Sequence, residues 1–132
     1  MAYLVDTDWI IDYLKGKKSI VNKLQKLFDE GLTISVISLA ELYEGIFASK
    51  EPKKHLNALQ CFLSGIVVLG ITDEVCQTFG KLRVEQRKTG VIIDNFDLLI
   101  GSTALVHNLT ILTDNIKHFT KIRGIKTKSS KL

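Results

Sequence analysis

The chain has 132 residues, the length of one ordinary domain, which leaves no room for two hydrophobic cores. Apolar residues make up 45% of it and charged residues 24%, a balance that excludes a disordered, collagen-like or disulfide-stapled protein. A net charge of +4 permits a polyanionic partner but does not prove one. We therefore expect a single globular domain over residues 1–132.

Short apolar strands alternate with helical patterns along the chain. Strands are predicted at residues 3–5, 32–35, 66–69 and 110–112, with a last one near 122–125. Helices are expected to begin after Asp6 and at Ser19, Ser38, Pro52, Thr72 and Asp94, and to end near Gly16, Gly31, Ile46, Gly65, Gly90 and Asn108. Because strands that alternate with helices form parallel sheets covered on both faces, the pattern predicts an α/β fold.

One segment, residues 55–72, contains no Asp, Glu, Lys or Arg and reaches the lower length limit of a membrane span. Its Asn, Gln, Ser and Gly residues favour instead the end of a helix, a turn and a buried strand. The first residues lack the basic region of a signal peptide. Cys61 and Cys76 lie among apolar residues without a CxxC spacing, so we expect buried thiols. These features predict a cytoplasmic protein without a membrane segment.

Four acidic residues lie just beyond predicted strands. Asp6 ends the first strand, and Glu41 is expected in the first turn of the helix after the second strand. Asp97 is expected in the first turn of the helix after residues 91–93, and Asp114 ends the strand at 110–112. Because ligand sites of open parallel sheets lie at the carboxyl ends of the strands, these four side chains should meet at one edge.

Four carboxylates in one place cannot all be ionised without a counter-charge. Oxygen ligands without His or Cys suit Mg²⁺ or Mn²⁺, which activate water and stabilise leaving oxygens in phosphoryl chemistry. Without these four acids, the rest of the chain carries 18 basic and 10 acidic residues, a net charge of +8. The pattern indicates a polyanionic substrate that is held by its backbone.

Most of the acids also have a structural interpretation. Glu41 follows Ser38 at the spacing of a capping box, and Asp97 stands where a helix dipole favours an acid. Asp114 is in position to cap a short helix after it. Only Asp6 lacks an ordinary structural role, so the joint arrangement of the four acids, rather than any one of them, favours a site.

The same segments resemble the motifs of the PIN-domain ribonucleases and, within them, of the VapC-type toxins of bacterial toxin–antitoxin pairs. The resemblance covers nearly the whole chain and rests on YLVDTDWII at 3–11, SLAELYEG at 38–45, DNFDLLI at 94–100, and LTDN at 112–115 with His118-Phe119. It implies a PIN-like three-layer α/β/α sandwich with a central parallel sheet of four to five strands. It also implies an endoribonuclease that needs Mg²⁺, with Mn²⁺ as a substitute, and that blocks translation as the toxin of a VapBC pair.

The resemblance also implies roles for individual residues. The expected catalytic and metal-binding acids are Asp6, Glu41, Asp97 and Asp114. The residues expected to orient them, or to hold a metal-bound water, are Thr7, Asp94, Thr113 and Asn115. Hydrolysis to 5′-phosphate and 3′-hydroxyl ends needs no catalytic histidine, so three residues are interpreted as structural or surface groups: His55, His107 and His118.

The implied partners are an RNA substrate (tRNA or rRNA), a VapB-type antitoxin and a second copy of the chain. DNA is expected only indirectly, through the antitoxin, and no membrane is implied. The first candidates to bind the RNA backbone are Lys15, Lys17 and Lys18. Apolar residues of the early helices are candidates for the protein-contact surface: Trp9, Ile10, Tyr43 and Phe47.

Three alternatives stay open. Asp6 and Asp8 look like the DxD pair of haloacid-dehalogenase-like phosphatases, although that chemistry gives Glu41 no role. A receiver-like signalling domain also places acids at strand ends, and a catalytically silent PIN domain that only binds RNA or protein has the same motifs. Asp8 itself is either a fifth acid of the site or a helix N-terminal charge.

Overall fold

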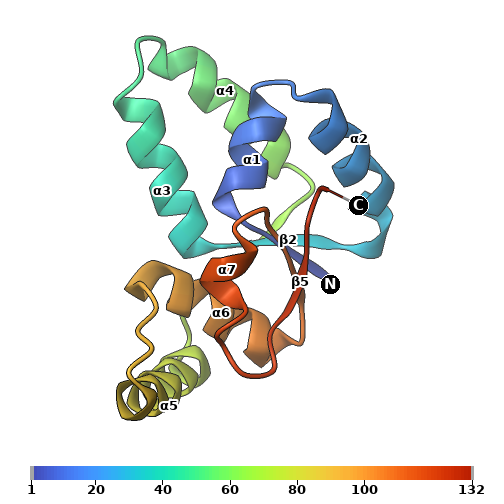
Figure 1. Ribbon diagram of the computed structural model, residues 1–132. Helices are drawn as coiled ribbons and strands as arrows, with labels where there is room; N and C mark the ends of the chain where they lie inside the picture. Colours follow the sequence, from blue (N-terminus) through green and yellow to red (C-terminus); the bar gives the residue numbers. More distant parts are fainter. Residues whose placement is uncertain (1, 132) are drawn as a thin grey trace.

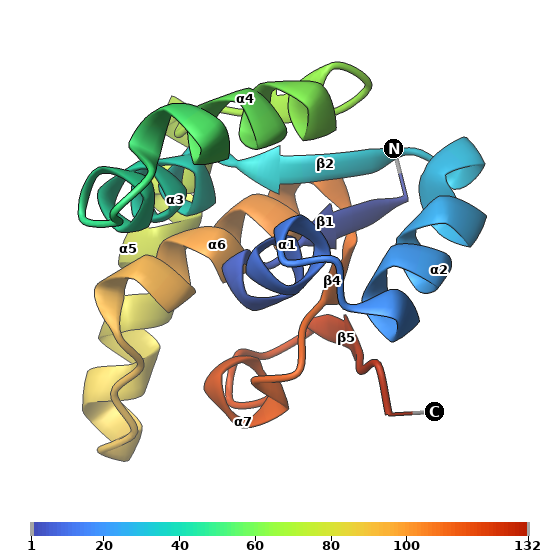
Figure 2. The ribbon, with the colours of Figure 1, turned by 90° about the horizontal axis from the view of Figure 1, so that it is seen from above.

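A parallel sheet of five strands forms the centre of the computed structural model, which describes residues 2–131. Met1 and Leu132, the two ends of the predicted domain, lie outside the described residues. The strands are β1 (Tyr3–Val5), β2 (Leu32–Ser35), β3 (Val67–Leu69), β4 (Thr110–Leu112) and β5 (Lys126–Lys128). They run in the order β3-β2-β1-β4-β5 with every neighbouring pair parallel, which confirms the predicted sheet; Figure 2 shows β2, β1, β4 and β5 in this order.

Helices cover both faces of this sheet, and two hydrophobic clusters lie between the layers (Figure 1). On one face pack α1 (Thr7–Leu14), α2 (Lys18–Leu27), α3 (Val36–Phe47) and α4 (Pro52–Leu63), and a 3-10 turn, η1 (Phe28–Glu30), follows α2. On the other face pack α5 (Asp73–Thr89), α6 (Asn95–His107) and α7 (Ile116–Phe119). Successive residues of a strand point to opposite faces of the sheet, so in β1 Val5 packs in the cluster on one face and Leu4 in the cluster on the other. The predicted three-layer architecture is therefore confirmed.

Two helices begin earlier in the chain than the sequence predicted. Ser35, not Ser38, is the N-cap of α3, and its hydroxyl accepts a hydrogen bond from the Ile37 amide at 3.0 Å. Val36 and Ile37 are β-branched and resemble strand residues, which hid this boundary. As a result, Glu41 lies in the second turn of α3, not the first. Ser19 likewise lies inside α2 and is not its cap.

The edges of the sheet differ from the sequence expectation. Val67 and Val68 were predicted to be buried, but they are 50% and 37% exposed because β3 is an edge strand. The last strand was predicted near 122–125, but Ile122 packs in the core and a turn at Gly124 (φ +83°) delays β5 to residue 126.

The predicted burial of the cysteines was wrong, since Cys61 and Cys76 are both exposed, although both are free thiols as expected. They lie on the outer sides of α4 and α5, whose core-facing positions are taken by residues such as Leu59 and Val75. Residues 55–72 form the end of a helix, a turn and a strand, as predicted. Within residues 2–131, the structure contains no helix that is both long and apolar enough to cross a membrane.

Burial in the central strands should dominate the stability of the fold. We expect Ile111→Ala, in β4 and 0% exposed, to lower the free energy of unfolding by about 2–5 kcal/mol, because it opens a cavity. The matched control Ile92→Ala, at a side chain that is 70% exposed, should change it by less than about 0.5 kcal/mol. Urea unfolding followed by circular dichroism measures both, and equal losses would contradict the assigned packing.

Candidate active site

Asp6 lies where β1 ends and α1 begins. It is the N-cap of α1, and its Oδ1 accepts a hydrogen bond from the Thr7 amide at 2.9 Å. Its Oδ2 accepts one from the hydroxyl of Thr113, directly after β4, at 2.8 Å. Because β1 and β4 are neighbours, the sheet itself fixes the groups that orient both oxygens of this buried carboxylate.

Thr7 joins Asp6 to the second predicted acid. Its hydroxyl donates to Oε1 of Glu41 at 2.8 Å, which links α1 to α3. Glu41 therefore does not reach back to Ser38, and the capping-box interpretation was wrong. One threonine thus contacts two carboxylates that come from distant segments of the chain.

The third acid, Asp97, lies in the first turn of α6 and is paired with a histidine. Nδ1 of His118, in α7, lies 3.0 Å from Oδ2 of Asp97. Sequence reasoning did not assign His118 to the site. The available signal was its position in the last motif, four residues after Asp114. The pair is formed because α6 and α7 are adjacent on the same face of the sheet.

The acids at this edge lack a full counter-charge. Burial, and then repulsion from Asp8, raises the pKa of Asp6 to about 7, although hydrogen bonds from Thr113 and Thr7 oppose this shift. Burial also raises the pKa of three neighbouring carboxyl groups, those of Asp8, Glu41 and Asp97. Repulsion from other acids adds to each of these shifts. His118 opposes the shift at Asp97.

These shifts have a consequence for stability. An acid whose pKa is higher in the folded chain binds its proton more tightly there than in the unfolded chain. For Asp6, the contribution to folding therefore becomes less favourable as the pH rises from 3.8 towards about 7. The fold tolerates a charge arrangement at neutral pH that is unfavourable by itself, which is characteristic of functional sites.

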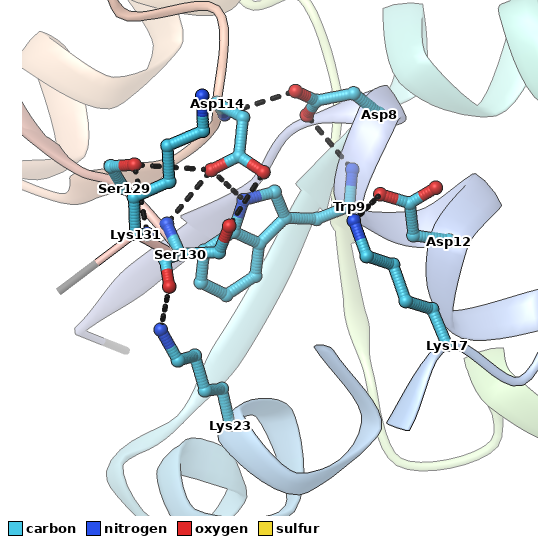
Figure 3. A network of polar contacts seen from close by, with 9 residues as sticks. All are labelled: Asp8, Trp9, Asp12, Lys17, Lys23, Asp114, Ser129, Ser130 and Lys131. Carbon is cyan, nitrogen blue, oxygen red and sulfur yellow. Dashed lines mark hydrogen bonds and ion pairs between the residues drawn. The ribbon is translucent and has the colours of Figure 1, made fainter. Parts of the chain in front are cut away.

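Asp114 is held differently from the other three acids (Figure 3). Its oxygens accept hydrogen bonds from the Trp9 indole at 3.3 Å, the Ser129 hydroxyl at 3.2 Å, and the amide and hydroxyl of Ser130 at 2.8 and 2.7 Å. Partial burial tends to raise the pKa of Asp114, but these bonds outweigh it and hold the pKa below its usual range. The structure therefore connects this carboxylate to the C-terminal segment and not directly to Asp6.

Asp8 connects the two groups of acids. Its Oδ1 accepts a hydrogen bond from the Trp9 amide at 2.8 Å, and its Oδ2 accepts one from the Asp114 amide at 3.0 Å. Electrostatic repulsion couples Asp8 to Asp6 and to Asp114. Both interpretations of Asp8 therefore apply, because it bonds to a helix N-terminal amide and lies within the electrostatic reach of the site.

The donor chemistry fits a hydrated divalent cation. Among residues 2–131, no three Asp, Glu, His or Cys side chains are already spaced as a complete metal site. Mg²⁺, however, keeps several waters and takes only one or two protein carboxylates directly. The all-oxygen set of Asp6, Glu41 and Asp97 suits such an ion, and its charge would relieve the repulsion that raises their pKa values.

Two of the remaining predicted residues lie at the margin of this site. Asp94 is the N-cap of α6, where its Oδ2 accepts a hydrogen bond from the Phe96 amide at 3.1 Å. Its charge raises the pKa of Glu41 and Asp97, so it is close to both. The side chain of Asn115 is exposed. Its backbone N–H contacts the site by donating a hydrogen bond to the Thr113 hydroxyl at 2.9 Å.

The predicted RNA-binding loop does not border the acids. Helix α1 has eight residues and is therefore about 12 Å long, with Asp6 at its start and Lys15 at its end. Lys17 forms an ion pair with Asp12 at 3.7 Å (Figure 3). Lys15, Lys17 and Lys18 are all exposed, at the end of α1 remote from the sheet edge.

A buried arginine supports the segment that carries Asp94 and Asp97. Arg83, in α5, is 9% exposed and donates to Oε1 of Gln86 at 3.1 Å and to Oδ1 of Asn95 at 2.6 Å. The same Gln86 oxygen accepts a bond from the Ile93 amide at 3.3 Å. Sequence reasoning missed this role, because an arginine between other basic residues resembles a solvated helix face.

Comparisons with known proteins agree with this fold. A model of the PIN domain family matches residues 3–125. The chain is 36% identical over 127 residues to Ribonuclease VapC2 of Rickettsia felis, with 95% of each chain covered, and 31% identical over 128 residues to Ribonuclease VapC1 of Haemophilus influenzae, with 96% of each covered. Its fold matches a crystal structure of VapBC2 from Rickettsia felis bound to a promoter DNA fragment, with a TM-score of 0.91, 34% identity and 98% of both chains covered.

The chain belongs to the PIN-domain family. Within that family it is similar to the VapC ribonucleases. Its strand order, 3-2-1-4-5, also differs from the 2-1-3-4-5 order of receiver domains. The receiver-like and haloacid-dehalogenase-like interpretations are therefore not retained.

The polar network around Arg83 should hold the start of α6 in place. We expect Arg83→Met to lower the free energy of unfolding by about 1–3 kcal/mol, because it removes both hydrogen bonds that the buried guanidinium donates to Gln86 and Asn95. Amide exchange at Ile93 should also become faster. The control Arg87→Met, at an exposed position of the same helix, should do neither. Equal behaviour of the two variants would show that Arg83 has no positioning role.

Proposed function

We propose that the protein is a divalent-metal-dependent endoribonuclease and the toxin of a VapBC-type toxin–antitoxin pair, blocking translation by cutting RNA. The observation that carries this proposal is the convergence of Asp6, Glu41 and Asp97, with raised pKa values, at the carboxyl edge of the sheet. Relatives named as VapC ribonucleases cover 95–96% of the chain, so the whole described fold takes part in the likeness.

In this proposal Asp6, Glu41 and Asp97 hold Mg²⁺, or Mn²⁺ in its place. Asp114 is the fourth acid. Three of its four hydrogen bonds, all from neutral donors, fall on Oδ1, and Oδ2 accepts only the bond from the Ser130 hydroxyl. Oδ2 therefore remains able to face a cation, and the charge of Asp114 also acts on Asp8.

The reaction is hydrolysis of a phosphodiester. Water attacks phosphorus, the bond to O3′ breaks, and the products carry a 5′-phosphate and a 3′-hydroxyl. The cation, when bound, lowers the pKa of water and stabilises charge on the leaving oxygen. In this proposal Thr7 and Thr113 keep the carboxylates oriented and His118 fixes Asp97, and Asp94, exposed and close to Glu41 and Asp97, would accept a hydrogen bond from the attacking water.

The proposed partners follow the relatives. The structure from Rickettsia felis is a VapBC2 complex on DNA, and we propose a VapB-type antitoxin here as well, with DNA contacted through it. A homodimer in the cytoplasm, acting on tRNA or rRNA, completes the proposal. Trp9 and Ile10 are 1% and 0% exposed, which removes them from the predicted contact surface. Phe47, 66% exposed and stacked on Tyr43 at 6.1 Å, remains available for protein contacts.

RNA cleavage by protein free of antitoxin tests the function. Purified tRNA and total RNA should be cut at discrete positions with Mg²⁺ or Mn²⁺ and remain intact with EDTA. Asp97→Asn and Glu41→Gln should each lower the rate by at least about 100-fold, because each removes a charge of the proposed ligand set. Ligation of an adaptor that requires a 5′-phosphate identifies the product ends.

The matched control is Asp29→Asn, which removes the same charge at an exposed position after α2. It should cut RNA at the wild-type rate. Cleavage that persists in EDTA, or that is lost equally in Asp29→Asn, would contradict the proposal. So would a folded, metal-supplied protein that cuts none of these RNAs.

A further inference from the structure

A small basic pocket lies between α2, the end of β5 and the first turn of α1. Its volume is about 150 Å³ and its lining residues are Trp9, Lys23, Lys26, Leu27, Lys128 and Ser129. We propose that this basic pocket binds a backbone phosphate of the RNA, next to the phosphodiester that is cut. This inference rests on the proposed function and adds a substrate-binding site to it.

The side chains that line the basic pocket include lysines and no carboxylate. Helix α2 contains lysines but no Asp or Glu, and no acidic residue follows Asp114 in the chain. Within the described part of the chain, no carboxylate forms an ion pair with Lys26 or Lys128. The ammonium group of Lys128 lies 6.0 Å over the ring of Tyr3. A phosphate would therefore meet the ammonium groups of Lys26 and Lys128, which form no ion pair with a described carboxylate.

The basic pocket adjoins the acidic edge of the sheet. Its wall residue Ser129 donates its hydroxyl to Asp114 at 3.2 Å, and its wall residue Trp9 donates its indole N–H to the same oxygen at 3.3 Å. Lys23 donates to the carbonyl of Ser130, which fastens the C-terminal segment to α2 (Figures 1 and 3). An RNA strand lying across the acids thus passes directly to the lysines.

Size and chemistry favour a phosphate over a whole nucleotide or a base. A volume of about 150 Å³ is below the roughly 300–1,000 Å³ typical of sites that enclose small molecules. Trp9 is 1% exposed, so its ring is not available for stacking on a base. Lysine recognises phosphate as a point charge and reads no sequence. The basic pocket should therefore contribute affinity for RNA and not base specificity.

The test compares two double variants with equal loss of charge. Lys26→Gln/Lys128→Gln removes two cations of the basic pocket, and Lys15→Gln/Lys18→Gln removes two from the remote end of α1. Fluorescence anisotropy measures their binding to a labelled single-stranded RNA of about 12 nucleotides in EDTA, at several salt concentrations. With about 0.7 counterions released per single-strand contact, loss of two contacts should weaken binding by about 25-fold at 0.1 M salt and lower the salt slope by about 1.4.

The control variant Lys15→Gln/Lys18→Gln should bind RNA nearly as the wild type does. Lys26→Arg/Lys128→Arg should also keep the wild-type affinity for RNA, because it keeps both positive charges. Unchanged binding by the pocket variant, or equal weakening in the control, would overturn the inference. If the pocket variant binds RNA as the wild type does but no longer binds an acidic protein partner, the phosphate site is likewise refuted. If the wild-type protein cuts RNA and the pocket variant binds RNA unchanged, only the phosphate site is refuted. If the wild-type protein does not cut RNA, the proposed function is refuted.

Discussion

Everything at this site depends on the burial of Asp6 at the end of a central strand. Parallel pairing of β1 with β4 brings the backbone after both strands to one edge, and the Thr7 amide and Thr113 hydroxyl then fix the two oxygens of Asp6. Burial and the neighbouring Asp8 raise its pKa to about 7. The ionised carboxylates at this edge therefore repel one another, and a bound cation would reduce this repulsion.

Acidic and basic side chains lie on opposite sides of the C-terminal segment. Asp114 lies on one side, held by Ser129 and Ser130, and the lysines of the basic pocket lie on the other. Trp9 contributes to both, since its indole N–H donates to Asp114 and the residue is one of those that line the pocket. Residues 126–131 thereby shape the edge that we propose to face the RNA, although they add only a short edge strand to the sheet.

The sequence was sufficient to predict the parallel sheet and the approach of the acids, because strand alternation fixes which ends of the strands meet. It was insufficient for contacts between side chains of remote segments. The pairing of His118 with Asp97, the burial of Arg83 and the attachment of Asp114 to the tail all depend on how helices pack against one another. The start of α3 at Ser35 was missed because β-branched residues follow the cap.

The most direct test is the pKa of the Asp6 carboxyl group, measured by ¹³C NMR titration with and without Mg²⁺, with Asp6→Asn to assign the resonance. Without metal, we expect a midpoint near 7. With saturating Mg²⁺, the midpoint should fall, because a bound cation favours the charged form. A metal-free midpoint near 3.8 that Mg²⁺ leaves unchanged would contradict the account, because Asp6 would then carry no excess repulsion for a cation to relieve.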